Sequence, residues 1–169
     1  MDITELILED HHQQRRMFAL LEETAPSDTR ALGILWHRLC TTLEVHAAAE
    51  EELFYPHLWK LGTGVGDETV DAEVIDVIKD HNEIRDAIGE SAGHQPGTDA
   101  WWAAVRKTNK ANSDHMAEEE REDLTDFRRN APLQLRHDIA VAFATFEAEH
   151  VRGVEVTDRD PERYVAEHR

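Results

Sequence analysis

The chain has 169 residues, with 18 lysines and arginines against 36 aspartates and glutamates, for a formal net charge of −18. This length suits one domain, and the negative field argues against nucleic acid or an anionic membrane as a partner, because both carry phosphate. The N-terminus lacks a basic, apolar leader, and no run approaches about 18 apolar residues. The single cysteine, Cys40, cannot form an internal disulfide. We therefore expect a cytoplasmic protein.

Apolar residues recur at helical spacing along most of the chain. The first predicted helix runs from Ile3 to about Leu21, with Asp2 and Glu5 as its N-terminal cap, and ETAPS at residues 23–27 ends it. A second helix carries apolar residues from Leu32 to Phe54. It should end in the stretch 56–66, which contains three glycines.

A third predicted helix begins near Asp67 and extends to about Ile88, and GHQPGTD at residues 93–99 closes it. Thr98 can cap a fourth helix that continues through Trp101. The sequence NAP at residues 130–132 interrupts this pattern before a fifth helical stretch, which includes Phe143. The segment after Gly153 is charged, and we expect it to be loose.

No strand-like alternation competes with these helices, and the short connections favour antiparallel neighbours. The predicted fold is therefore all-α. It consists of an up-and-down antiparallel four-helix bundle over residues 1–130, an appended helix over 131–153 that packs on the bundle, and a charged, flexible tail over 154–169.

Each bundle helix directs one histidine toward the core, given about 100° of rotation per residue. These histidines are His11, His46, His81 and His115, at intervals of 35, 35 and 34 residues. Near-constant intervals in an antiparallel bundle return each histidine to a similar depth. Glu50 and Glu119 follow the second and fourth histidines by four residues and share their faces. We therefore expect six polar side chains to converge midway along the bundle.

Such a cluster is costly in a core unless something neutralises it. A single His-x-x-x-Glu pair is an ordinary neighbour pair on a helix, and core histidines satisfied by the two glutamates are the simplest alternative. Four inward histidines at matched depth favour a metal site. Imidazole and carboxylate without thiolate suit iron or manganese and allow zinc. Six ligands exceed one tetrahedral site, so we expect two metal ions about 3.5–4 Å apart, bridged by the carboxylates.

The order His, His-x-x-x-Glu, His, His-x-x-x-Glu on successive helices resembles the hemerythrin-like, or HHE cation-binding, domains. The local settings agree, with DHH at residues 10–12, HAAAEEELFYP at 46–56, DHNEI at 80–84 and HMAEEERE at 115–122. The resemblance implies a hemerythrin-like bundle with a non-haem di-iron centre whose two irons share an oxo or hydroxo bridge. It also implies terminal ligands His11, His46, His81 and His115, and bridging ligands Glu50 and Glu119.

Proteins of this kind bind dioxygen or nitric oxide, react with peroxide, or sense iron or redox state. Oxygen carriers have a further histidine one turn after the third-helix histidine, where this chain has Arg85, and arginine cannot ligate a metal. An open iron position favours peroxide decomposition or related redox chemistry, by a catalase-like or oxygen-activating oxidoreductase. The alternative is non-enzymatic binding or sensing of O2, NO or iron.

Several further residues carry secondary expectations. Tyr55 is a candidate phenolate ligand, with solvent as the alternative, but a straight helix directs it away from His46 and favours packing near the helix end. Arg85 should contact a carboxylate of the site or an anionic ligand, or else extend its charge to water at a bundle end. Two Glu-x-x-His pairs, Glu9 with His12 and Glu147 with His150, lack the partners of a ferritin-type site. The acidic residues interpreted as a solvated face are Glu51, Glu52, Glu118, Glu120 and Glu122.

Overall fold

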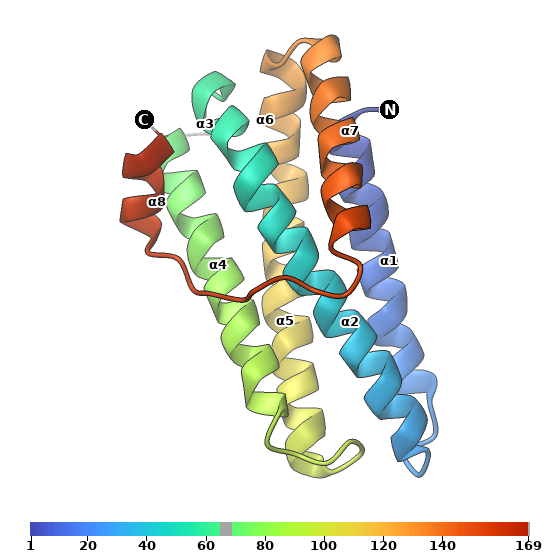
Figure 1. The fold of residues 1–169 in the computed structure, drawn as a ribbon. Coiled ribbons are helices and arrows are strands. Elements are labelled where there is room, and N and C mark those ends of the chain that lie inside the picture. Colours follow the sequence, from blue (N-terminus) through green and yellow to red (C-terminus); the bar gives the residue numbers. More distant parts are fainter. Residues whose placement is uncertain (65–68, 169) are drawn as a thin grey trace.

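The computed structural model describes residues 1–64 and 69–168, and every regular element among them is helical. Four long helices form an antiparallel bundle (Figure 1), which confirms the predicted all-α architecture. They are α1 (Ile3–Glu23), α2 (Thr29–Ala49), α4 (Val70–Ser91) and α5 (Asp99–Arg121). The appended helix, α7 (Leu133–Glu149), packs against α1 and α2. None of the described helices combines the length and apolar content needed to cross a bilayer.

Side-chain caps start the helices. The Asp2 carboxylate accepts a hydrogen bond from the Thr4 amide, and the Thr98 hydroxyl accepts one from the Trp101 amide, as the sequence predicts. The predicted start of the third helix near Asp67 lies outside the described residues. Among those described, α4 begins at Val70, after Thr69 accepts a hydrogen bond from the Ala72 amide.

The second helix ends inside the predicted stretch 56–66, but it is not one continuous α-helix. After α2 the chain forms a π-helical turn, η1 (Glu50–Phe54), and then helix α3 (Tyr55–Leu61). Pro56 occupies the first turn of α3, where the lack of an amide proton is tolerated. The Tyr55 amide bonds to the carbonyl of Glu50, five residues back, so the turn holds one residue more than an α-helical turn.

The segment after Gly153 differs from the flexible tail that its charge predicts. It crosses α2 (Figure 1) and ends in helix α8 (Pro161–His168), which packs on α4. Tyr164 and Val165 on α8 are buried in the same apolar cluster as residues of α3 and α4. Two apolar residues in a charged octapeptide are therefore enough to dock this helix.

The apolar core forms two layers. One layer includes Ile7, Phe54 and Ile78, and the other includes Phe18, Trp36 and Ile88. Along α1, His11 lies between Ile7 of the first layer and Phe18 of the second, and His81 is placed in the same way along α4. A buried polar layer thus separates the two apolar layers. A second helix extension, α6 (Asp123–Asn130), continues α5 into the first layer through Leu124 and Phe127.

Candidate metal centre

The polar layer brings together the four histidines that the sequence places at equal depth. Their ring centroids lie 5.3 Å apart for His11 and His46, and 4.7 Å apart for His81 and His115. The Nε2 atoms of the latter pair are 3.2 Å apart. No member of the cluster is more than 4% exposed. The residues are His11, His46, Glu50, His81, His115 and Glu119.

Glu50 lies between the two histidine pairs. Its Oε1 is 3.0 Å from Nε2 of His46, and its Oε2 is 3.3 Å from Nε2 of His81. Glu119 has a comparable position, with Oε2 3.2 Å from Nε2 of His11 and 4.0 Å from Nε2 of His115. Oε2 of Glu50 is also 4.0 Å from Nε2 of His115, so Glu50 faces histidines of three helices and Glu119 faces histidines of two.

The buried polar atoms of this layer fit a cation better than they fit one another. Nε2 of His11 and of His46, both oxygens of Glu50 and Oε2 of Glu119 have no hydrogen-bond partner among the described residues. They are close, but they lack hydrogen-bond geometry, and buried polar groups are rarely left in that state. His11, His46 and Glu50 can place one ligand atom each within 4.8 Å of one another, and so can Glu50, His81 and His115. Glu50 belongs to both groups, as a bridging carboxylate would.

A carboxylate faces the outer nitrogen of every histidine. Nδ1 of His11 is 2.9 Å from Glu120, and Nδ1 of His81 is 2.8 Å from Glu51. Longer approaches place Nδ1 of His46 at 3.6 Å from Asp10 and Nδ1 of His115 at 3.7 Å from Asp80. A carboxylate on Nδ1 directs the Nε2 lone pair inward and makes it a better metal ligand.

The carboxylates around two of these rings, His81 and His46, also favour their protonated forms. Burial lowers the pKa of His81, but its contacts with the Glu50 and Glu51 carboxylates outweigh burial and raise the pKa to about 9. The pKa of His46 is also raised, because Glu50 and Asp10 outweigh its burial. Metal binding at this layer must therefore release protons.

Arg85 and Glu51 correct the interpretation of the acidic face. Glu51 is buried, and its Oε1 lies 2.6 Å from Nη2 of Arg85, while its Oε2 lies 2.6 Å from Nε of Arg159. Arg85 is only 8% exposed and does not extend to water; it contacts a carboxylate, but that of Glu51, which is not one of the six candidate ligands. Glu120 is likewise bound, to His11 and Arg15. The solvated interpretation was therefore wrong for Glu51 and Glu120, whereas Glu52 and Glu118 are exposed and Glu122 is half-buried.

Tyr55 also departs from its expected position. The extra residue in η1 rotates it by about 100° toward the bundle axis. Its side chain is fully buried, and its hydroxyl donates a hydrogen bond of 2.8 Å to Oε1 of Glu119. Burial, followed by the charges of Glu119 and Glu50, raises the pKa of Tyr55 well above its usual value. The geometry makes Tyr55 a donor to a candidate bridging carboxylate.

We expect Tyr55→Phe to fold and to bind cations, but to lose about 1 kcal/mol of unfolding free energy through the lost hydrogen bond. Iron-loaded wild type and variant should have the same visible spectrum, because a protonated phenol gives no phenolate-to-iron absorption. Urea unfolding and an optical spectrum measure both. A visible band that is present in the wild type and absent from the variant would show that Tyr55 is a ligand.

Sequence reasoning missed Asp10, Asp80 and Glu147. Asp10 and Asp80 each precede a site histidine in the chain, but each faces the histidine of a neighbouring helix. The repeated Asp-His dipeptide was the available signal. Glu147, on α7, can place an oxygen within 4.8 Å of ligand atoms of Asp10 and His46. No spacing rule connects α7 with α1 and α2.

The fold and this layer define a helical-bundle protein with a buried histidine and carboxylate cluster suited to cations. The family model of the hemerythrin HHE cation binding domain matches residues 2–126, and the chain belongs to this family. The match ends within α6, so α7 and α8 lie outside it. No curated protein and no solved structure matches the chain.

Proposed function

We propose that this chain is a non-haem di-iron protein that decomposes hydrogen peroxide. Two groups of potential ligands that share Glu50 carry the proposal, together with buried atoms that have no hydrogen-bond partner among the described residues: Nε2 of His11 and His46, both oxygens of Glu50 and Oε2 of Glu119. The six residues can supply ligands for two metal ions, and imidazole with carboxylate suits iron. His11, His46 and Glu50 would hold one ion, and His81 and His115 with Glu50 the other, with Glu119 as the second bridge.

Two iron ions held here would supply the two-electron redox chemistry that converts two peroxide molecules into two waters and one dioxygen. The protein residues set the conditions for that reaction. The outer carboxylates hold the Nδ1 protons and fix the ring orientations. Tyr55 fixes one oxygen of Glu119. The two apolar layers limit the water around the site.

Arg85 supports peroxide turnover over oxygen storage in this proposal. It stands where an oxygen carrier would have a fifth histidine, so that one ligand position is left for exchange. Its guanidinium is bound to Glu51, which in turn contacts His81. Arg85 therefore acts on the centre by positioning Glu51 and the ring of His81.

Purified protein loaded under anaerobic conditions should bind two irons per chain and evolve oxygen from hydrogen peroxide faster than the same amount of free iron. His81→Ala should lose most of this activity, because it removes one inward ligand, whereas the exposed His12→Ala should retain it. Metal analysis and an oxygen electrode give both quantities.

A different result would identify a binding protein. If the loaded wild type evolves no more oxygen than free iron, and its diferrous form binds dioxygen reversibly over many cycles, the carrier function replaces the enzymatic one. Reversible binding of nitric oxide, without turnover of peroxide, would support a sensor.

A further inference from the structure

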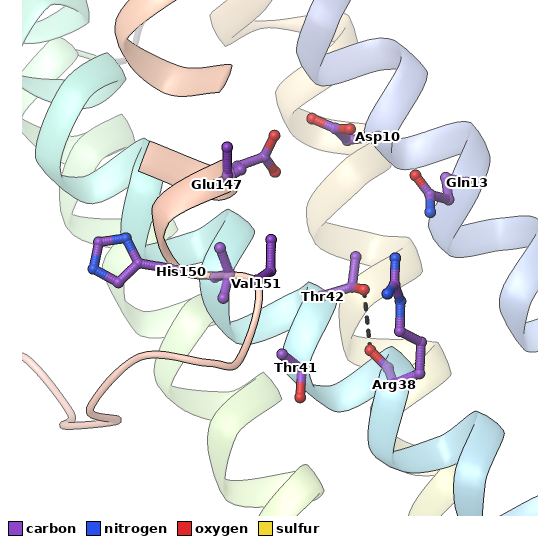
Figure 2. Close-up of a pocket in the computed structure, with 10 residues that line it drawn as sticks. Asp10, Gln13, Arg38, Thr41, Thr42, Glu147, His150 and Val151 are labelled. Atoms are coloured by element: carbon purple, nitrogen blue, oxygen red, sulfur yellow. Dashed lines mark hydrogen bonds between the residues drawn. The ribbon is translucent and has the colours of Figure 1, made fainter. Parts of the chain in front are cut away.

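A polar pocket of about 250 Å³ lies where α7 packs against α1 and α2. Asp10 and Glu147 line it and point toward one another (Figure 2). Thr41 and Thr42 contribute hydroxyl groups to its wall. The pocket lies on the outer side of His46, outside the central cluster, and one of its walls belongs to the part of the chain that the family model does not match.

Three helices contribute the candidate ligand atoms beside this pocket. Asp10 and Glu147 line the pocket, and His46 does not line it but lies within reach of both. Nδ1 of His46 has no hydrogen-bond partner among the described residues, and neither has Oδ2 of Asp10, which lies 3.6 Å away. The His46 side chain is 5% exposed. One ligand atom each of Asp10, His46 and Glu147 lies within 4.8 Å of the other two. A buried imidazole nitrogen thus faces two carboxylates at metal-ligand spacing.

The charges of the two facing carboxylates favour a cation. Burial, followed by the negative charge of Asp10, raises the pKa of Glu147 to about 7. Two half-buried carboxylates at close range repel each other when both are ionised, and a cation between them removes that repulsion. Arg38 also lines the pocket, but it lies on the side of Gln13 (Figure 2), away from the facing carboxylates.

We propose that Asp10, Glu147 and Nδ1 of His46 form an outer site for a divalent transition-metal ion, through which ions reach the central cluster. Two oxygens and one imidazole nitrogen, without sulfur, suit ferrous and related ions. The role of this outer site in passing ions inward rests on the proposed function, because the ions would be passed to the central cluster.

Because His46 belongs to both the outer site and the central cluster, we expect an ion to occupy one of its two nitrogens at a time. A neutral imidazole has one lone pair, so an ion on Nε2 leaves the proton on Nδ1, where it donates to Asp10. The outer site then keeps two carboxylates and loses its nitrogen ligand. An ion at the outer site is therefore held best while the inner position on His46 is empty, and filling of that position weakens the outer site.

The test is the rate at which metal-free protein takes up Co²⁺, followed by its visible absorption. Glu147→Gln should slow uptake by about tenfold, since it removes one of three ligands from the outer site, and loss of even a group beside a metal ligand lowers metal affinity by about 10- to 100-fold. The final amount bound should be unchanged. Glu149→Gln removes the same charge from an exposed position on α7 and should load at the wild-type rate. The difference should persist in about 1 M salt, where the Debye length is about 3 Å and general field effects vanish.

Two outcomes would overturn the outer site. The first is a Glu147→Gln protein that loads at the wild-type rate, and slower uptake by Glu118→Gln would then assign entry to another opening. The second is a lower final amount of cobalt in Glu147→Gln, which would make Glu147 part of the centre. Glu118 lines a second, acidic opening that reaches His115 and Glu119.

If Glu147→Gln does not fold, a second measurement on the wild type tests the outer site. Wild-type crystals soaked briefly in Co²⁺ should show anomalous scattering between Asp10 and Glu147, and scattering at the central cluster alone would contradict the proposal. A wild type that binds no Co²⁺ and no iron would overturn the proposed function as well. Unaffected uptake in a protein that still decomposes peroxide would overturn the outer site only.

Discussion

Replacing Glu50 with alanine is expected to abolish binding at both proposed metal positions, because Glu50 belongs to both groups of potential ligands. Saturation of the wild type at about 100 times the dissociation constant should raise its unfolding free energy by about 2.7 kcal/mol. The variant should gain nothing at the same concentration. Its affinity should fall by more than the roughly hundredfold upper limit seen when groups outside the ligand set are removed.

Thermal unfolding with and without Fe²⁺, and metal analysis after gel filtration, measure this effect. Glu52→Ala is the matched control, since Glu52 lies in the same π-helical turn and is exposed. A Glu50→Ala protein that still carries two irons would rule out the bridging role. A protein that carries one would assign Glu50 to a single position.

Glu51→Ala is expected to lower the unfolding free energy by about 3–5 kcal/mol, as removal of one partner of a buried ion pair does. The loss arises mainly from Arg85, whose buried guanidinium would keep its charge without a carboxylate. Arg159 contributes less, because its side chain is 42% exposed and water screens it.

Urea unfolding of metal-free protein measures the loss, and Glu52→Ala again provides the comparison. Glu51→Gln should recover part of the stability, since an amide oxygen still accepts from arginine. An effect within about 0.5 kcal/mol, typical of exposed positions, would mean that the carboxylate is solvated after all.

The central part of this structure was predictable because it depends on local periodicity. The 3.6-residue repeat places Ile7, His11 and Phe18 on one face of α1, and equal histidine spacing sets a common depth in an antiparallel bundle. Fold class and convergence of the six polar side chains follow from these two patterns alone.

The surroundings of the cluster were not predictable in this way, because they depend on contacts between helices. Asp10 faces His46 on the next helix, and Glu51 meets Arg159 from the far end of the chain. Tyr164 and Val165 are too few to give α8 a clear apolar period. Whether the six central residues bind metal stays a prediction.

The π-helical turn holds one residue more than an α-helical ladder needs. Deleting the exposed Glu52 would restore an ordinary ladder, and because the lost residue and the lost π turn offset each other, Tyr55 would keep its direction toward Glu119 and Leu58 its place in the apolar layer. An added residue has no such offset and would turn every later side chain of that helix by about 100°. Relatives of this chain should therefore lack one residue in this segment more often than they gain one.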